Sequence, residues 1–120
     1  MEIQFIYNAN NGVANSLFDL AHKIISPDTY ECNLCKITHG AFTENKKFKE
    51  LKEKYNITLW HIDDYEEKFS KESSYPLIIM RDERGTEKNR IATEIINKIN
   101  TVDMLEDLIE VHNQVNTLKS

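Results

Sequence analysis

The stretch Tyr75-Pro76-Leu77-Ile78-Ile79-Met80 decides the predicted fold. Its apolar run is typical of a β-strand, and its proline stands at the entrance, where a missing backbone amide is tolerated. Residues 81–85 carry charges and a glycine, and they predict a turn. A further strand near residues 88–92 then completes an antiparallel hairpin.

Two more strands are predicted upstream of this hairpin. Within residues 2–7, Ile3, Phe5 and Tyr7 occupy alternate positions, which is the period of a strand. Residues 57–62 have apolar side chains on both faces, as expected of a strand that is covered on both sides. We therefore expect a mixed sheet of four strands, near residues 2–7, 57–62, 76–81 and 88–92.

Segments with the apolar period of a helix lie between and after these strands. They are residues 13–25, residues 44–55, a short segment after Asp64, residues 93–99 and a last helix from residue 102. Residues 28–43, in contrast, have no regular period and predict an irregular connection. The alternation of periods indicates one α/β domain over residues 1–120, with helices on both faces of the sheet.

Composition places the chain among ordinary globular proteins. Its 120 residues are 40% apolar and 29% charged, with only three glycines and two prolines. The N-terminal segment has no basic start followed by an apolar run, so we expect no signal peptide. No stretch approaches the ~20 apolar residues of a membrane helix. We expect a cytoplasmic protein that does not bind membranes.

Charge is distributed unevenly along the chain. Residues 1–60 carry seven acidic and seven basic side chains, whereas residues 61–120 carry thirteen acidic and eight basic ones, which gives the net charge of −5. The lysines of residues 46–54 alternate with glutamates at helical spacing, which is typical of a solvated helix face. Nucleic acid is therefore not an expected partner, and a protein or a small molecule is.

Both cysteines lie in the irregular connection, as Cys32-Asn33-Leu34-Cys35. Two thiols at this spacing can bind a metal, and His39, four residues after Cys35, could supply a third ligand. His22 or His61 could complete the tetrahedral set that zinc prefers. Zinc is the cofactor that these five residues predict, and they would hold the connection in place.

The same two thiols allow two other interpretations, namely that they catalyse redox chemistry or that they are only packed in the fold. In a thiol oxidoreductase Cys32 and Cys35 would be catalytic, with one thiol partly exposed and made acidic by a helix N-terminus or by a cation such as Lys36. In a protein that binds no metal, the thiols would pack inward with Tyr30, Leu34 and Ile37 as a small separate cluster. The spacing alone leaves all three readings open.

The positions of the histidines and of the first turn in the predicted elements indicate what each contributes. His61 follows the strand predicted at residues 57–62, and ligands collect at such strand ends in open α/β sheets. His22 and His112 lie on the predicted inner flanks of their helices, where packed histidines are common. The turn at residues 8–12 is not a phosphate-binding P-loop, because the chain lacks G-x-x-x-x-G-K-[ST].

The predicted order of elements resembles the thioredoxin-like fold, in which two parallel strands join an antiparallel hairpin. Tyr75-Pro76 opens the penultimate strand, where thioredoxins place a cis-proline beside their active thiols. Thioredoxins carry the CxxC directly after the first strand, whereas this chain carries it one helix later. The resemblance implies a thioredoxin-like mixed four-stranded sheet, and it does not carry over the catalytic thiol position.

Several short tracts also resemble a family of small bacterial proteins, some of which are labelled GTPases. The tracts are Tyr7-Asn8-Ala9-Asn10-Asn11-Gly12, Ala21-His22-Lys23, Ser26-Pro27 and Thr29-Tyr30-Glu31-Cys32-Asn33-Leu34-Cys35. This resemblance brings no established activity. The sequence thus predicts either a protein whose CxxC serves redox chemistry or zinc binding, or a non-catalytic module with packed cysteines that binds a protein or a small molecule.

Overall fold

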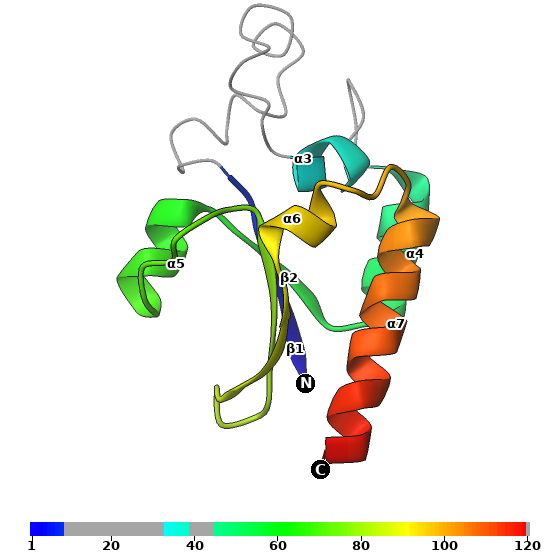
Figure 1. Cartoon of the computed structure of the whole chain (residues 1–120). Coiled ribbons are helices and arrows are strands. Elements are labelled where there is room, and N and C mark those ends of the chain that lie inside the picture. The colour runs from blue at the N-terminus through cyan, green and yellow to red at the C-terminus, as the bar shows by residue number, and fades with distance from the viewer. Residues whose placement is uncertain (9–32, 39–44, 120) are drawn as a thin grey trace, which may run out of the picture.

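The computed structural model describes residues 1–8, 33–38 and 45–119. Their helices and strands alternate along the chain (Figure 1). The elements are β1 (Glu2–Ile6), α3 (Asn33–Thr38), α4 (Lys46–Lys54), β2 (Ile57–Trp60), α5 (Ile62–Lys68), β3 (Leu77–Arg81), β4 (Glu87–Ile91), α6 (Thr93–Ile96) and α7 (Val102–Lys119). The helix predicted at residues 13–25 lies outside the described residues.

The four strands form one mixed sheet in the order β2-β1-β3-β4. β1 runs parallel to β2 and antiparallel to β3, and β3 pairs with β4 as an antiparallel hairpin. The predicted strands and the mixed four-stranded sheet are confirmed. Pro76 lies directly before β3, and the peptide bond from Tyr75 to Pro76 is cis.

The two central strands carry the core, because both of their faces are covered. Every residue of β3 is buried. β2 lies at an end of the sheet, and Leu59 is 37% exposed. The prediction that the strand at residues 57–62 is covered on both faces was therefore wrong. An apolar pattern cannot distinguish an edge strand from a central one when the neighbouring strand comes from elsewhere in the chain.

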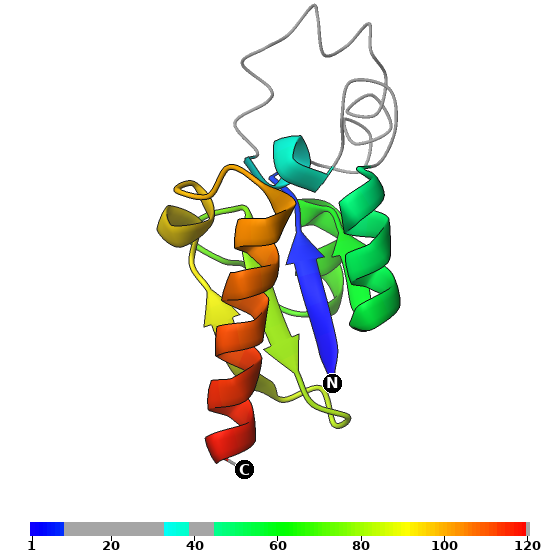
Figure 2. The ribbon, with the colours of Figure 1, turned by 90° about the vertical axis from the view of Figure 1, so that its right-hand side faces the viewer.

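One face of the sheet is covered by α3, α4, α6 and α7 (Figures 1 and 2). Side chains from β1, β3 and β4 meet the inner sides of these helices in a single large apolar cluster. Phe5 of β1 stacks on Phe48 of α4, with 5.6 Å between the ring centroids. Asn45 caps α4 by accepting hydrogen bonds from the amides of Lys47 and Phe48.

The opposite face is covered by α5, so the prediction of helices on both faces is confirmed (Figure 1). A second, smaller apolar cluster lies here, formed by Ile6, Tyr65, Leu77 and Ile79. Tyr65 also stacks on Phe69 at 5.1 Å, as the four-residue spacing of a helix face allows. Among the described helices, none is long and apolar enough to cross a membrane.

Arg81 belongs to this second face, and it stands where the strand predicted at residues 76–81 meets the turn predicted at residues 81–85. It ends β3 next to a register irregularity, and it is only 9% exposed. Its guanidinium donates hydrogen bonds to Gln4 Oε1 and Tyr65 Oη, both at 2.7 Å, and to the carbonyl of Gly85 at 3.0 Å. It also stacks over the ring of Phe69, 4.1 Å from the centroid. These neutral acceptors and the aromatic ring let a charged group lie inside the fold.

Candidate functional site

The structure describes two of the five predicted site residues. Cys35 lies in α3, and His61 lies directly after β2. Cys32, His22 and His39 lie outside the described residues. The pairing of the two cysteines and the zinc ligand set therefore stay predictions.

The segment that carries Cys35 is a short helix and not the irregular connection that was predicted. Residues 33–38 form α3, in which Leu34, Cys35 and Ile37 are all buried. Cys35 is only 3% exposed and belongs to the main apolar cluster, not to a separate small one. Six residues span fewer than two helical turns, too short for a period to be recognised in the sequence.

Asn33 holds the first turn of α3 in place. Its side-chain amide donates hydrogen bonds to the carbonyls of Ile96, at 2.7 Å, and Ile99, at 2.8 Å. Ile96 ends α6, and Ile99 lies in the turn that follows it. The start of α3 is thus tied to a segment more than sixty positions away in the sequence.

Thr38 holds the other end of α3. Its hydroxyl donates to the carbonyl of Leu34 at 2.8 Å and forms a 2.8 Å hydrogen bond with the hydroxyl of Tyr7, which follows β1. The carbonyl of Thr38 accepts from the amide of Asn45, the cap of α4, at 2.8 Å. Thr38 and Tyr7 are both buried. Helix α3 is thus bonded at its start to the end of α6 and at its end to the residue after β1 and to the cap of α4.

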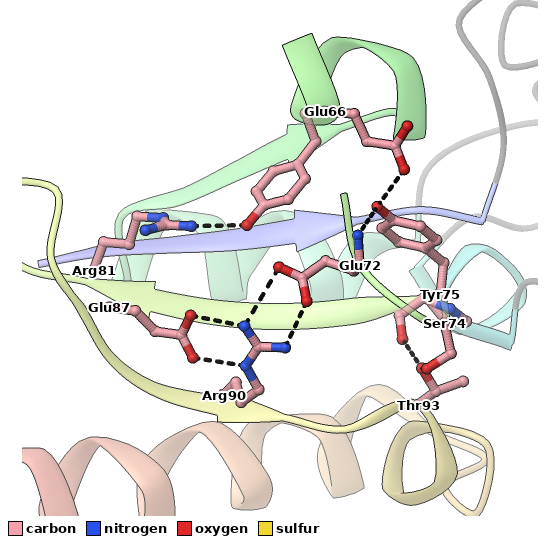
Figure 3. Close-up of polar contacts among 10 residues, drawn as sticks. Glu66, Glu72, Ser74, Tyr75, Arg81, Glu87, Arg90 and Thr93 are labelled. Atoms are coloured by element: carbon pink, nitrogen blue, oxygen red, sulfur yellow. Dashed lines mark hydrogen bonds and ion pairs between the residues drawn. The ribbon is translucent and has the colours of Figure 1, made fainter. Parts of the chain in front are cut away.

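Residues 69–76 form the approach to β3, and tyrosine and glutamate side chains hold them (Figure 3). The hydroxyl of Tyr75 donates to Glu66 of α5 at 2.9 Å and accepts from the amide of Glu72 at 3.2 Å. Burial, helped by the hydrogen bond to Glu66, raises the pKa of Tyr75 to about 12. Tyr75 therefore stays neutral and remains a hydrogen-bond donor over the usual pH range.

Arg90 of β4 ties the same segment to the edge of the sheet (Figure 3). Its guanidinium contacts Glu72 at 2.9 Å and Glu87 at 2.6 Å. The hydrogen bonds from Arg90 hold the pKa of the Glu87 carboxyl below its ordinary value. The two glutamates in turn raise the pKa of Arg90, so the guanidinium stays charged.

Helix α6 connects this segment to α3. At its start, Thr93 donates to the carbonyl of Pro76 at 2.9 Å and forms a 2.8 Å hydrogen bond with Ser74 (Figure 3). At its end, the carbonyls of Ile96 and Ile99 accept from Asn33. One helix of four residues therefore positions both the entrance of β3 and the helix of Cys35.

His61 is half-buried at the end of β2, as its place in the sequence suggested. Its Nδ1 atom lies 3.2 Å from Oδ2 of Asp64, one turn further along α5. Within the described residues, no group of three or more histidine, cysteine, aspartate or glutamate side chains could hold a metal ion. A role for His61 in a site stays a prediction.

Two shallow cavities lie beside α3 and α4. A cavity of about 280 Å³ runs between α4 and α7, and two surface ion pairs span it, Lys47 to Asp103 and Lys54 to Glu106, each at 2.9 Å. A second cavity, of about 350 Å³, is lined by Lys36 and Ile37 of α3 and by residues 100–103 before and in α7. Both are open and bordered by charged side chains, which suits a small polar molecule at most.

No protein-family model, curated protein or solved structure matches this chain. The fold and the site define an α/β protein with a mixed four-stranded sheet, in which a buried cysteine lies on a short helix bonded at both ends. The resemblances to thioredoxins and to the small bacterial family stay predictions.

Sequence reasoning missed the residues that position Cys35. Asn33 stands between the two cysteines, and an amide side chain there was the one available signal. The partners of Asn33, Thr38 and Arg90 come from other parts of the chain, so no local pattern could have named them.

Proposed function

We propose that this chain is a thioredoxin-like domain whose Cys32 and Cys35 form a reversible dithiol–disulfide pair. The sheet order β2-β1-β3-β4, the parallel β1 and β2, the antiparallel β3 and β4 hairpin, and helices on both faces support the thioredoxin-like part. The position of Pro76 at the entrance of β3 is the feature at residue level that supports it.

The burial of Cys35 is the observation that carries the redox part. An apolar surrounding favours an uncharged sulfur over a thiolate, because the charged form loses its solvation. A thiol and a disulfide are both uncharged, so both the reduced and the oxidised form of Cys35 are compatible with the apolar cluster around it. A zinc site needs thiolate ligands, which the apolar cluster around Cys35 favours less.

The proposed reaction is an exchange with the disulfide of another molecule. Because Cys35 is buried, we assign the attack to the thiolate of Cys32, which forms a mixed disulfide and releases one thiol of the partner. The sulfur of Cys35 then displaces the second thiol and closes the Cys32–Cys35 bond. The two cysteines lose two protons and two electrons, and the partner disulfide becomes two thiols.

The experiment equilibrates untagged full-length protein with glutathione buffers of graded redox ratio, traps free thiols by alkylation, and weighs the intact chain. We expect one reversible transition between a doubly alkylated and an unalkylated form. Cys32→Ser and Cys35→Ser should each remove this transition. Two alkylatable thiols in the most oxidising buffer would overturn the proposal.

The alternative function is a non-catalytic binding module with packed cysteines, and the same burial of Cys35 favours it. In that case both thiols stay reduced and react with iodoacetamide at pH 6 no faster than free cysteine. Metal analysis of protein purified without a chelator tests the zinc-site hypothesis, which requires clearly more than about one zinc per ten chains.

A further inference from the structure

Asn33, the described residue that directly follows Cys32, has a side chain anchored by two hydrogen bonds. It is the first residue of α3 and stands between Cys32 and Cys35 in the sequence. Its amide group has two hydrogens, and both are donated, one to Ile96 and one to Ile99, at 2.7 and 2.8 Å. We call this pair of bonds the Asn33 clamp.

The two acceptors make the clamp specific. Carbonyls at the end of a helix lack partners within the helix. Those of Ile96 and Ile99 belong to buried residues, and among the described residues the Ile96 carbonyl accepts only one long backbone hydrogen bond, from the amide of Ile99 at 3.3 Å, besides the shorter bond from Asn33. A half-buried amide that meets both carbonyls is therefore a fixed contact and not one of many exchangeable surface bonds.

The helix that holds Asn33 is itself held. The start of α6 is bonded through Thr93 to the carbonyl of Pro76 and to Ser74, next to the central strand β3 (Figure 3). The clamp therefore ties α3 to the sheet through α6, in addition to the bond between Thr38 and Tyr7.

We propose that Asn33 is a positioning residue for the thiol pair, an inference that rests on the proposed function. Asn33 is covalently joined to Cys32, and α3 fixes it relative to Cys35. The clamp thus restricts the chain between the two sulfurs before the bond closes. Ring closure then costs less conformational freedom, which favours the disulfide.

The clamp and the disulfide favour one another. Without the clamp, the reduced chain gains freedom at the start of α3, whereas the oxidised chain remains restricted by its own disulfide. Loss of the clamp therefore stabilises the reduced form, through its greater conformational entropy, relative to the oxidised form. The disulfide then becomes easier to reduce. Reciprocally, oxidation strengthens the clamp.

The test measures the equilibrium constant with glutathione for Asn33→Ala in the full chain, by the same alkylation and mass measurement. We expect this constant to shift roughly tenfold toward the reduced form, from the loss of two hydrogen bonds. Asn33→Asp has the same size and no amide hydrogens, and it should shift the constant in the same direction. Asn33→Gln keeps the amide and should shift it less.

Asn89→Ala is the matched control, because the side-chain amide of Asn89 also donates to a helix carbonyl, that of His112 at 3.3 Å, and takes no part in the contacts of α3 and α6. It should retain the wild-type constant. If circular dichroism shows that Asn33→Ala does not fold, the constants of Asn33→Asp and Asn33→Gln test the positioning role instead. Folded Asn33 variants with an unchanged constant would overturn the positioning role alone. A wild-type protein that never oxidises would overturn the proposed function, and the inference with it.

Discussion

At the scale of the residue, Arg81 shows how a charge is kept inside this fold. Its guanidinium donates hydrogen bonds to Gln4, Tyr65 and the carbonyl of Gly85, and its Cζ atom lies over the ring of Phe69. The Nε2 atom of Gln4 is buried with no hydrogen-bond partner among the described residues. The cluster is thus short of acceptors, and each acceptor that it has contributes to stability.

The hydroxyl of Tyr65 is the acceptor that can be removed most cleanly. We expect Tyr65→Phe to lower the free energy of unfolding by about 1–3 kcal/mol, because a buried N–H of Arg81 loses its partner. Urea unfolding followed by circular dichroism measures this loss. Tyr55→Phe, at a half-buried tyrosine outside the cluster, is the control and should change stability by less than about 0.5 kcal/mol. Equal losses in the two variants would contradict the role given to Tyr65.

At the scale of the element, residues 69–76 have no regular secondary structure, and side-chain hydrogen bonds and an ion pair hold them in position. Arg90 supplies the contact to Glu72, and Tyr75 supplies the contact to Glu66 (Figure 3). Because only Phe69 and Tyr75, near its ends, pack on the second apolar cluster, while residues 70, 71, 73 and 74 are exposed, the middle of the segment should open locally before the sheet unfolds. Its order matters for the site, since it leads to Pro76 and, through Thr93, to α6.

Arg90→Ala tests this dependence. The half-buried ion pair should contribute about 1 kcal/mol, so its loss should increase local opening roughly fivefold. Trypsin cleavage after Lys71, followed by mass spectrometry under native conditions, reports this opening. Lys88→Ala is the matched control on the same strand, because the ion pair of Lys88 with Asp82 is longer, at 3.8 Å. The same acceleration in both variants, or none in Arg90→Ala, would show that Arg90 does not hold the segment.

At the scale of the whole molecule, stability should depend on pH through the carboxylates that the fold holds ionised. The pKa of Glu87 is lowered from its ordinary value of 4.5, chiefly by the hydrogen bonds from Arg90. A lowered pKa in the folded state stabilises the protein above the unfolded pKa, and this contribution is lost as the pH falls through the folded pKa. Acid should therefore weaken the fold below a pH of about 4.5.

Glu87→Gln isolates that contribution. At pH 7 the variant should be less stable than the wild type by up to about 1 kcal/mol, since the ion pair is partly exposed. The difference should shrink to zero as the pH falls through the folded pKa of Glu87. Urea unfolding at a series of pH values measures it, with Glu83→Gln on the exposed turn as the control. A difference that stays constant with pH would exclude the ion pair as its cause.

Much of the fold could be predicted because the strands have clear local patterns. The run in β3 and the alternation in β1 come from side chains that must be buried, so their periods appear in the sequence. The helix α3 was missed because it is short, and its apolar residues Leu34 and Ile37 looked like part of a loop. The burial of Arg81 at the end of β3 was not predicted, because a charged residue is rarely buried without a carboxylate.

The sequence by itself determined the four strands, the helices other than α3 among the described residues, and the presence of one CxxC. These properties follow from local periods and from covalent order. Only the tertiary structure decided that β2 is an edge strand, that Cys35 is buried in the main core, and that Asn33 bonds to the end of α6. Each of these depends on contacts between residues far apart in the chain, and such contacts leave no period in the sequence.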